Sequence, residues 1–459
     1  MKFHELSRNM CEWDRLDEWR GKIRTGLAEG QMGRISPFHL LSIAGISAAE
    51  QRACSDLWLK SRMEASTLDR AELAFEYNST DRPKIRVGYL SNDFQEHATA
   101  LLIVEMLESH NSACFETYAY SYGREDNGTM RKRLRHCFDH FVDIEALSNK
   151  TAACAIHNDQ VDILVDLKGY TQGSRTEILT FRPAPIQVNF LGYPGTLGGG
   201  LCDYIITDRF LTPPDKAEDY SEAFAYLPHS YQPHGRKVFI GPPPTRTEAG
   251  LPEEGFVFCC FNQAYKFSPE IFDVWCQLLS DVPESVLWLL QNSKAEGNLR
   301  NEAYQRGINP NRLVFAENLE QIKHLCRLGL ADLVLDTLPF NAHTTASDAL
   351  WVGVPLVTLT GSTFPSRVAG SLLHAIQMPE LITNDLQGYY ELALELASSS
   401  GYLEQVKAKL KRNRLTTSLF DVQAYTSDLE RLYETMWERH RDGRRPEAIS
   451  VSMMRPQFI

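Results

Sequence analysis

The residues best suited to chemistry lie where an apolar run ends and a loop begins. In LADLVLDTLPFNAHTTASDALWVG, residues 330–353, the apolar run Leu333–Leu335 leads through a loop to His343-Thr344-Thr345 and then to an apolar helical pattern that ends at Gly353. A helix that starts just past the carboxyl end of a parallel strand points free N–H groups and its positive dipole end into a crevice, where phosphates bind. This stretch therefore predicts an anion-binding helix tip.

The same residues also allow a plainer interpretation. Thr345 is followed three residues later by Asp348, a spacing that fits a capping box in which the two side chains only close a helix end. Taken alone, this pair favours the plain interpretation. The candidate groups elsewhere in the chain favour the anion site.

A cationic group follows another predicted strand. Lys266 ends the segment FNQAYK, directly after the predicted strand Phe256–Phe261. A lysine in that place can neutralise the charge that develops on a departing phosphate group, although a solvated surface lysine is the alternative. His324 and Arg327 lie one turn apart on a predicted helix, where they either flank a base or phosphate or form a surface pair.

The first half of the chain carries its own candidates. Asp93 and His97 follow the first predicted strand, where solvated loop residues are the alternative. Two glycine-containing loops, residues 169–173 and 191–196, also follow strands, and small residues there let backbone N–H groups approach a ligand. Turn formation alone explains either loop. His39 is the one candidate group in the N-terminal helical region.

Several common site types are missing from the sequence. It has no Asp-x-Asp, no His/Asp/Glu cluster with metal spacing, no GxxxxGK[ST], no GxGxxG after the first strand and no GxSxG. Kinase, simple dehydrogenase and serine hydrolase functions therefore lose support. If the leaving group is a diphosphate, we expect Lys266 and the helix tip at Thr344-Thr345 to stabilise it, with no metal ion and no other cofactor.

Bulk properties restrict the class of protein. A chain of 459 residues with 43% hydrophobic and 23% charged residues predicts a globular protein with more than one core. A net charge of −12 without a long Lys/Arg run argues against nucleic-acid and anionic-membrane partners. The ten cysteines form no CxxC, the N-terminus is no signal peptide, and no apolar run could span a membrane. We therefore expect a cytoplasmic protein.

The periodicity predicts an α/β protein of two doubly wound Rossmann-like lobes that face a cleft, with a small helical cap in front. The expected domains are a cap at 1–80, a first lobe at 81–240, a proline-rich linker at 241–250, and a second lobe at 251–459 that closes with helices at about 401–413 and 422–440. The α/β pattern opens in the segment 84–94, which contains the first predicted strand. The other predicted strands are Phe115–Tyr122, Ile163–Leu167, Ile186–Leu191, Tyr204–Asp208, Phe256–Phe261, Val286–Leu290, Arg312–Phe315, Leu333–Asp336 and Leu356–Leu359.

Long motifs in this order resemble a known family. They are RVGYLSNDFQEH (86–97), GYTQGSR (169–175), RPAPIQVNFLGYPGT (182–196), DYIITD (203–208), FNQAYKF (261–267), PESVLWLL (283–290), LADLVLDTLPFNAHTT (330–345) and LERLYETMWERH (429–440). Over nearly its whole length, the chain resembles the catalytic region of the protein O-linked N-acetylglucosamine transferases, a glycosyltransferase family that also includes the plant SPINDLY-type enzymes.

The resemblance implies the GT-B fold and an inverting, metal-independent transfer of N-acetylglucosamine from UDP-GlcNAc to Ser/Thr hydroxyls of proteins. It implies that the second lobe is the nucleotide-sugar side and the first lobe the acceptor side. By resemblance, the uridine diphosphate is held by Gln263, Lys266, His324, Arg327, His343, Thr344, Thr345 and Asp348, with Asp348 on the ribose and Lys266 on the diphosphate. The groups expected near the sugar and acceptor are His97, Tyr265, Gly192 and Pro194. His39, His97 and Asp93 are alternatives for accepting the hydroxyl proton.

Two departures from the family pattern leave alternatives open. The chain lacks the long tetratricopeptide array of animal and plant members, so we expect another chain to recruit the acceptor. Gln321 stands where animal members have a lysine near the nucleobase, although FNQAYK is closer to the N-acetylglucosamine type. The alternatives are another donor, such as GDP-fucose or UDP-glucose, and a non-catalytic scaffold that binds a sugar nucleotide.

Overall fold

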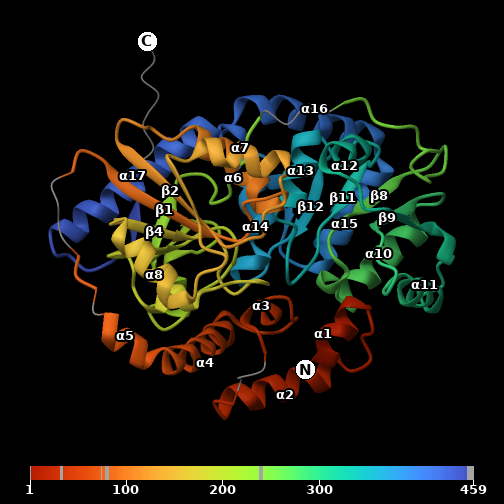
Figure 1. Ribbon diagram of the computed structural model, residues 1–459. Helices are drawn as coiled ribbons and strands as arrows, with labels where there is room; N and C mark the ends of the chain where they lie inside the picture. Colours follow the sequence, from red (N-terminus) through yellow and green to blue (C-terminus); the bar gives the residue numbers. More distant parts are fainter. Residues whose placement is uncertain (1, 32–34, 74, 78–81, 237–240, 452–459) are drawn as a thin grey trace. The chain divides into compact units, whose positions relative to one another are not determined.

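The structure of the protein, a computed structural model, divides into two compact units (Figure 1). It describes residues 2–31, 35–73, 75–77, 82–236 and 241–451. The first lobe comprises Gly26–Leu40, Ser47–Arg236 and Asp421–Ile459, and the second lobe comprises Met1–Thr25, Leu41–Ile46 and Lys237–Phe420. The limits predicted for the first lobe, at 81 and 240, and the predicted end of the second lobe at 459 lie outside the described residues.

The first lobe is built on an eight-stranded sheet whose neighbouring strands are all parallel. Its strands are β1 (Ile85–Ser91), β2 (Phe115–Ser121), β3 (His140–Asp143), β4 (Ile163–Asp166), β5 (Ile186–Asn189), β6 (Tyr204–Asp208), β7 (Ala223–Leu227) and β14 (Ile449–Ser450), in the order β14-β7-β6-β5-β4-β1-β2-β3. The direction of winding reverses between β1 and β4. Ligands of open α/β sheets bind beside such a reversal, at the carboxyl ends of the strands.

Helices connect and cover these strands. They are α3 (Pro37–Leu40), α4 (Ala48–Ala65), α5 (Thr67–Leu73), α6 (Ala98–Glu108), α7 (Thr129–Cys137), α8 (Asn149–Asn158), α9 (Glu177–Thr180), the 3-10 helix η1 (Pro214–Asp219) and α17 (Val422–Arg441). Strands β4 and β5 are buried at every residue, as is typical of parallel strands with helices on both faces. The apolar runs that predicted these strands are thus explained by burial on both sides.

The second lobe has a six-stranded parallel sheet. Its strands are β8 (Val257–Cys260), β9 (Val286–Leu290), β10 (Leu313–Ala316), β11 (Leu333–Leu335), β12 (Leu356–Leu359) and β13 (Ile382–Thr383), in the order β10-β9-β8-β11-β12-β13. This is the strand order of the dinucleotide-binding Rossmann fold, and its winding reverses between β8 and β11. All ten predicted strands are confirmed in the two lobes, whereas β3, β7, β13 and β14 were not predicted.

The helices of the second lobe surround this sheet. They are α1 (Lys2–Asn9), most of α2 (Leu16–Ala28), α10 (Pro269–Asp281), α11 (Glu296–Gln305), α12 (Gln321–Leu328), α13 (Thr344–Val352), α14 (Val368–Ala375), α15 (Leu386–Ser398) and α16 (Ser400–Thr416). Short 3-10 helices are η2 (Ala264–Lys266), η3 (Pro310–Arg312), η4 (Phe364–Ser366), η5 (Pro379–Leu381) and η6 (Ser418–Phe420). Across the described residues, no helix is both long and apolar enough to cross a membrane.

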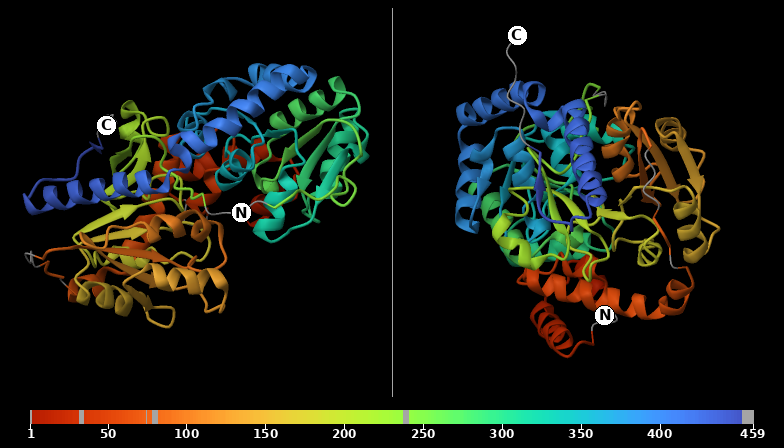
Figure 2. Two further views of the ribbon diagram at one scale, coloured as in Figure 1. Left: turned by 90° about the horizontal axis from the view of Figure 1, so that it is seen from above. Right: turned by 90° about the vertical axis from the view of Figure 1, so that its left-hand side faces the viewer.

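The last helix, α17, belongs to the first lobe although the sequence places it after the second. Its buried face includes Leu429, Leu432 and Tyr433, and the Tyr433 hydroxyl lies 3.3 Å from the hydroxyl of Tyr89 on β1. Figure 2 shows this helix, in blue, beside the yellow-green strands of the first lobe, in agreement with its contacts with β5 and β7. The second compact unit therefore does not coincide with the second lobe predicted at 251–459, because α17 buries its apolar face on the sheet of the first lobe.

The N-terminal helices are also divided between the lobes. Arg8 on α1 donates to Ser42 Oγ at 2.8 Å and to the backbone carbonyl of Tyr265, which ties α1 to the second lobe. In contrast, α4 packs on α9 in the first lobe, where Arg62 pairs with Glu177 at 2.9 Å. The residues expected as one cap at 1–80 thus pack as two groups, because α1 contacts η2 of the second lobe whereas α4 contacts α9 and η1 of the first.

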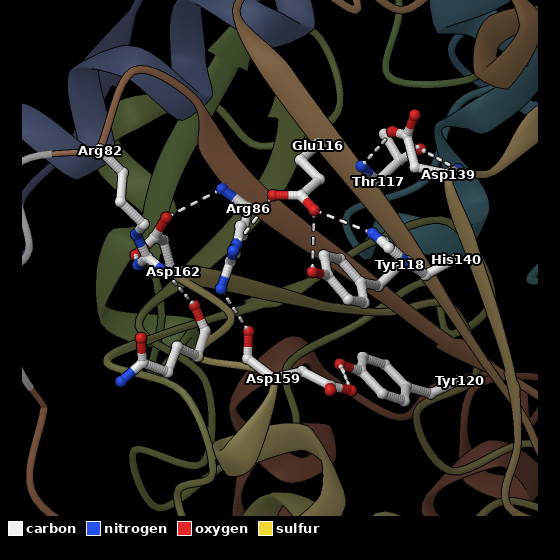
Figure 3. Close-up of polar contacts among 11 residues, drawn as sticks. Arg82, Arg86, Glu116, Thr117, Tyr118, Tyr120, Asp139, His140, Asp159 and Asp162 are labelled. Atoms are coloured by element: carbon white, nitrogen blue, oxygen red, sulfur yellow. Dashed lines mark hydrogen bonds and ion pairs between the residues drawn. The ribbon is translucent and has the colours of Figure 1, made fainter.

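A polar network covers the amino ends of the first-lobe strands, opposite the edge where ligands are expected (Figure 3). The Glu116 carboxylate accepts from Arg86 Nε at 2.8 Å and from the Tyr118 hydroxyl at 3.1 Å, and lies 2.8 Å from His140 Nε2. Asp162 accepts from Arg82 at 2.6 Å and from the backbone N–H of Arg86 at 2.8 Å. These charged groups lie away from the carboxyl edge of the sheet, and their hydrogen bonds hold the first residues of the strands in place.

Candidate active site

The winding reversal of the second lobe brings two predicted site segments together. Strands β8 and β11 are parallel neighbours, with Leu333 beside Phe258 and Val334 beside Cys259. The chain leaving β8 forms η2, which ends at Lys266, and the chain leaving β11 leads to α13. Both segments therefore emerge at one sheet edge, at the place where an open α/β sheet binds its ligand.

Lys266 is held by groups of its own lobe. Its ammonium donates to the backbone carbonyl of Asn341 at 2.8 Å and to Asn262 Oδ1 at 3.4 Å. It also lies 4.3 Å from the centre of the Phe340 ring, within the range of a cation–π interaction. The residue is only 8% exposed, so its charge is fixed in place.

One amide oxygen connects Lys266 with the start of α13. Thr345 Oγ1 donates to Asn262 Oδ1 at 2.9 Å, the same atom that accepts from Lys266. Asn262 Nδ2 donates to Thr337 Oγ1 at 3.1 Å, which turns the oxygen towards the two donors. Because both donors touch a single oxygen, one phosphate group is large enough to reach both.

Helix α13 begins at Thr344 with an open end. Its N-cap is His343, whose side chain makes no capping hydrogen bond to the described helix. The capping box proposed as the plain alternative for Thr345 and Asp348 is therefore wrong, because the helix starts two residues earlier than that box requires. The first N–H groups of a helix have no partner within it, so this end can bind an anion.

Asp336, at the end of β11, organises the loop before α13. Its carboxylate accepts from the N–H groups of Thr337 at 2.7 Å and Ala342 at 2.6 Å, and from Thr358 Oγ1 at 2.6 Å. Burial raises the pKa of Asp336 to about 6, although these hydrogen bonds oppose the shift. Burial lowers the pKa of Lys266 to about 8, and the nearby Asp336 charge opposes that shift. The lysine is therefore charged at neutral pH but sensitive to mild alkali.

The structure brings His324 and Arg327 together on α12. Arg327 Nη2 lies 3.0 Å from His324 Nδ1, and both groups pack on Phe261, the histidine ring at 5.1 Å and the guanidinium at 5.1 Å from its centre. Burial lowers the pKa of His324, and the Arg327 charge lowers it further. A neutral His324 therefore accepts at Nδ1 and carries its proton on Nε2.

The other predicted nucleotide contacts lie around the same edge. Gln263 is exposed just before η2, whereas the Tyr265 ring meets Phe340 edge-on with ring centres 6.3 Å apart. His343 stacks on Phe340 at 4.8 Å, and its pKa is lowered by burial, so it is neutral. Asp348 is buried within α13. The predicted nucleotide set thus belongs to one lobe and three neighbouring segments.

The remaining predicted residues belong to the first lobe. Asp93 follows β1, and the side chain of His97 lies with Nδ1 3.4 Å from Asp93 Oδ2. Lys168, which follows β4, reaches both carboxylate oxygens of Asp93, at 3.0 and 2.9 Å. These groups occupy the winding reversal of the first sheet. His39 lies on α3, where its ring meets Phe38 edge-on.

The glycine loops of the first lobe are tightly packed. A Cβ on Gly192 would collide with the carbonyl oxygen of Leu167, and a Cβ on Gly169 would collide with the Tyr193 side chain. Pro194 is buried beside them. Gly192 and Pro194 therefore help to shape the edge at which Asp93 lies, and close approach of two backbones explains why Gly169 and Gly192 are glycines.

Comparison with known proteins decides the family. A sequence profile described as glycosyl transferase family 41 matches residues 49–241 and 235–429. The chain belongs to glycosyl transferase family 41. Its similarity covers the catalytic region of the O-linked N-acetylglucosamine transferase and SPINDLY type, which confirms the resemblance seen in the motifs.

Three curated relatives illustrate this membership of family 41. The Arabidopsis thaliana SEC protein, named a probable UDP-N-acetylglucosamine–peptide N-acetylglucosaminyltransferase, is 39% identical over 80% of this chain and 38% of its own length. A Caenorhabditis elegans UDP-N-acetylglucosamine–peptide N-acetylglucosaminyltransferase is 29% identical over 95% and 48%, and Petunia hybrida SPINDLY is 31% identical over 83% and 42%. This family 41 chain thus spans less than half the length of these relatives.

Solved structures agree with the family 41 assignment. A mutant of the Thermobaculum terrenum O-GlcNAc transferase matches 91% of this chain and 83% of its own, with 27% identity and a TM-score of 0.76. Anabaena HepE, solved with UDP, matches 77% of this chain and all of its own, with 12% identity and a TM-score of 0.52, and supports the fold alone. The expected α/β GT-B fold is confirmed.

Sequence reasoning missed three polar residues of the candidate site: Asn262, Asn341 and Lys168. Lys168 carried a usable signal, since a charged residue that directly follows the predicted strand Ile163–Leu167 must find a partner. Asn262 bonds Thr345, 83 positions away, and Asn341 bonds Lys266, 75 positions away, so no local pattern indicates these contacts. In the described part of the chain, no group of three or more His, Cys, Asp or Glu side chains could hold a metal ion.

Proposed function

We propose that this chain is the catalytic region of an inverting, metal-independent glycosyltransferase that moves N-acetylglucosamine from UDP-GlcNAc to Ser/Thr hydroxyls of proteins. The observation that carries the proposal is the meeting of Lys266 Nζ and Thr345 Oγ1 on Asn262 Oδ1. A diphosphate oxygen that replaced Asn262 Oδ1 as acceptor would receive a charged donor and a hydroxyl donor beside an open helix end.

The proposed chemistry follows from this arrangement. The acceptor hydroxyl attacks the anomeric carbon on the face opposite the diphosphate, so a new C–O bond forms while the bond to the diphosphate breaks. The electron pair leaves with UDP, and the hydroxyl proton passes to a base, for which His97, Asp93 and His39 stay alternatives. Lys266 and the α13 N–H groups oppose the charge that grows on the leaving group, a task that a metal ion performs in other enzymes.

The relatives support the donor and the acceptor class. The names of the Arabidopsis and Caenorhabditis relatives state UDP-N-acetylglucosamine and a peptide. Identity to SEC, 39%, exceeds that to Petunia SPINDLY, 31%, over similar shares of this chain. In the same proposal, the protein acts in the cytoplasm and a partner chain helps to recruit acceptors.

A donor panel tests the substrate class. The protein is heated with UDP-GlcNAc, UDP-glucose, GDP-fucose, UDP or GDP while its unfolding is followed, because a ligand that binds the native state raises the Tm. We expect UDP and UDP-GlcNAc to give the largest rises. A larger rise in Tm with GDP and GDP-fucose would show that the donor is a GDP-sugar. No rise with any nucleotide would show that the protein has no nucleotide-sugar site.

A transfer assay tests the reaction. The protein is incubated with UDP-GlcNAc and a cell lysate or Ser/Thr peptide library, and N-acetylglucosamine attached to protein is measured. Lys266→Met, or Lys266→Ala, should abolish transfer while the fold survives. Lys409→Met is the matched control, since it removes a lysine paired with Glu380 on an exposed face of the same lobe. Near-normal transfer by the Lys266 variants would end the assignment, and donor binding without transfer by the wild type would favour a scaffold.

A further inference from the structure

Lys168 and Asp93 form a buried ion pair, and the proposed reaction assigns no role to Lys168. Their side chains are 7% and 6% exposed, and the lysine reaches both oxygens of the carboxylate. Removing two charges from water costs several kcal/mol per ion, so such a pair is weak evidence for stability alone. The pair lies beside the half-exposed His97, at the carboxyl edge of the first sheet. This position suggests that the pair determines which ring nitrogen of His97 carries the proton.

The loop after β4 fixes the lysine. The N–H of Lys168 donates to Asp166 Oδ1 at 3.1 Å, and its carbonyl accepts from Thr171 Oγ1 at 2.8 Å. The next residue, Gly169, has a φ of +51°, in the left-handed region that favours glycine. The backbone that carries Lys168 is therefore held on both sides, and its ammonium is aimed at Asp93.

Two groups contact His97 Nδ1, and they require opposite protonation states of this atom. The N–H of Thr99, in the first turn of α6, donates to Nδ1 at 3.2 Å, so Nδ1 must be an acceptor. Asp93 Oδ2 lies 3.4 Å from the same atom and would need a proton there. The Thr99 contact is shorter and is a hydrogen bond in the structure, and Asp93 already accepts from Lys168 and, at 3.4 Å, from Thr99 Oγ1. Nδ1 therefore carries no proton in the neutral ring.

We propose that Lys168 is a positioning residue: by occupying both oxygens of Asp93, it leaves His97 Nδ1 to cap α6 and presents His97 Nε2–H as a hydrogen-bond donor. Among the described residues, Nε2 has no hydrogen-bond partner, and 43% of the side chain is exposed. Partial burial lowers the pKa of His97; Asp93 opposes this shift and Lys168 adds to it, so the ring is neutral at pH 7.

The target of that donor rests on the proposed function: it would be an oxygen of the bound sugar or acceptor. His97 in this state cannot take the hydroxyl proton, because the nitrogen that faces solvent already carries one. The inference thus moves His97 from the candidate bases to the substrate-binding donors. Without Lys168, Asp93 would attract a proton to Nδ1 and turn Nε2 into an acceptor.

The tautomer of His97 tests this inference directly and without any substrate. Protein labelled with ¹⁵N-histidine is studied by long-range ¹H–¹⁵N NMR, and His97→Gln assigns the signal. We expect the Nε2–H form in the wild type, the same form in Lys168→Arg, and a shift towards Nδ1–H in Lys168→Met. The double variant Asp93→Asn, Lys168→Met removes both charges and should restore the Nε2–H form.

An Nδ1–H form in the wild type would overturn the inference, as would an unchanged tautomer in a folded Lys168→Met. If that single variant does not fold, the wild type and the double variant still decide. Because the tautomer is read without donor or acceptor, failure of the proposed transferase function would leave this result standing.

Activity gives an independent readout. The side-chain amide of glutamine can replace Nε2–H as a donor but cannot act as a base. We therefore expect His97→Gln to retain transfer within about tenfold of the wild type, the size of one hydrogen bond, and His97→Ala to lose more. Equal losses of about a hundredfold or more in both variants would indicate a general base and contradict the donor role.

Discussion

Lys266 and Thr345, 79 positions apart in the sequence, donate to the same oxygen atom, Oδ1 of Asn262, at 3.4 and 2.9 Å. The lysine comes from the segment after β8 and the threonine from the first turn of α13, which follows β11. Their meeting depends on β8 and β11 being parallel neighbours at the winding reversal of the sheet. An acceptor shared by a cation and a helix tip is the arrangement that a diphosphate needs.

Binding of UDP should weaken in mild alkali. Burial lowers the pKa of Lys266 to about 8, so the free protein loses this positive charge as the pH rises through that value. If binding needs the charged lysine, affinity for UDP should fall about tenfold between pH 7.5 and pH 9, as measured by calorimetry. Lys266→Arg is the control, because arginine stays charged and any ionisation of the nucleotide affects both proteins equally. An equal pH dependence in the two proteins would exclude Lys266 as its source.

The substitution Asn262→Asp is a small change in the side chain but should strongly weaken the binding of UDP. A carboxylate in that place would pair permanently with Lys266 and repel the diphosphate, so we expect the Kd for UDP to rise at least about tenfold. Asn301→Asp, on the exposed surface of α11 in the same lobe, makes the same chemical change and should leave the Kd unchanged. A Kd for Asn262→Asp within twofold of the wild type would show that the two donors do not meet the diphosphate at this oxygen.

Gly169→Ala should destabilise the protein. The residue has a φ of +51°, and an added Cβ would collide with Tyr193, so we expect a loss of about 2–3 kcal/mol in the free energy of unfolding. Gly297→Ala on α11 is the matched control. A Cβ there meets no atom within 4 Å, so that change should be neutral or stabilising by up to about 1 kcal/mol. Urea unfolding of both variants measures the difference, and equal stabilities would contradict the packing of the loop.

Glu116 should make stability depend on acid pH. Burial tends to raise its pKa, but hydrogen bonds from His140, Arg86 and Tyr118 outweigh this and hold the pKa at about 2. Its contribution is therefore complete above the ordinary pKa near 4.5 and is lost as the pH falls towards 2. Because the group is partly solvated, Glu116→Gln should cost only about 1 kcal/mol at pH 7.

That cost should shrink as the pH falls below 4, where the wild type also loses the charge. Glu404→Gln, on the exposed surface of α16, is the control and should change the stability neither at pH 7 nor below pH 4. Thermal unfolding across this range compares the variants. A constant difference between Glu116→Gln and the wild type at all pH values would assign the effect to packing rather than to charge.

The sequence predicted the sheets better than their surroundings. Runs such as Ile163–Val165 are apolar because helices cover both faces of the strand, and that burial leaves a clear pattern. β3, His140–Asp143, is short and partly exposed at the sheet edge, so it lacks such a run. The sequence predicted the helix at about 422–440, which is α17, as a closing helix of the second lobe. It could not indicate that this helix packs on the first lobe.

The candidate site was predicted unevenly for a similar reason. Lys266 and His343-Thr344-Thr345 were found because each follows a strand, and parallel strands bring their carboxyl ends to one edge. The acceptors that position Lys266, Asn262 Oδ1 and the Asn341 carbonyl, depend on how two loops fold against each other. Lys168 was overlooked because its partner, Asp93, lies 75 positions earlier, just after β1, a strand that only the sheet order makes the neighbour of β4.

The most direct test of the central claim is a double-variant cycle on UDP binding, with uridine as the comparison. Calorimetry measures the Kd for each ligand in the wild type, Lys266→Met, Thr345→Val and the double variant. We predict that each single change weakens UDP by roughly tenfold or more, leaves uridine unchanged, and that the two effects are not additive because both donors bind one diphosphate. Additive effects, or equal losses for uridine and UDP, would contradict a shared diphosphate site.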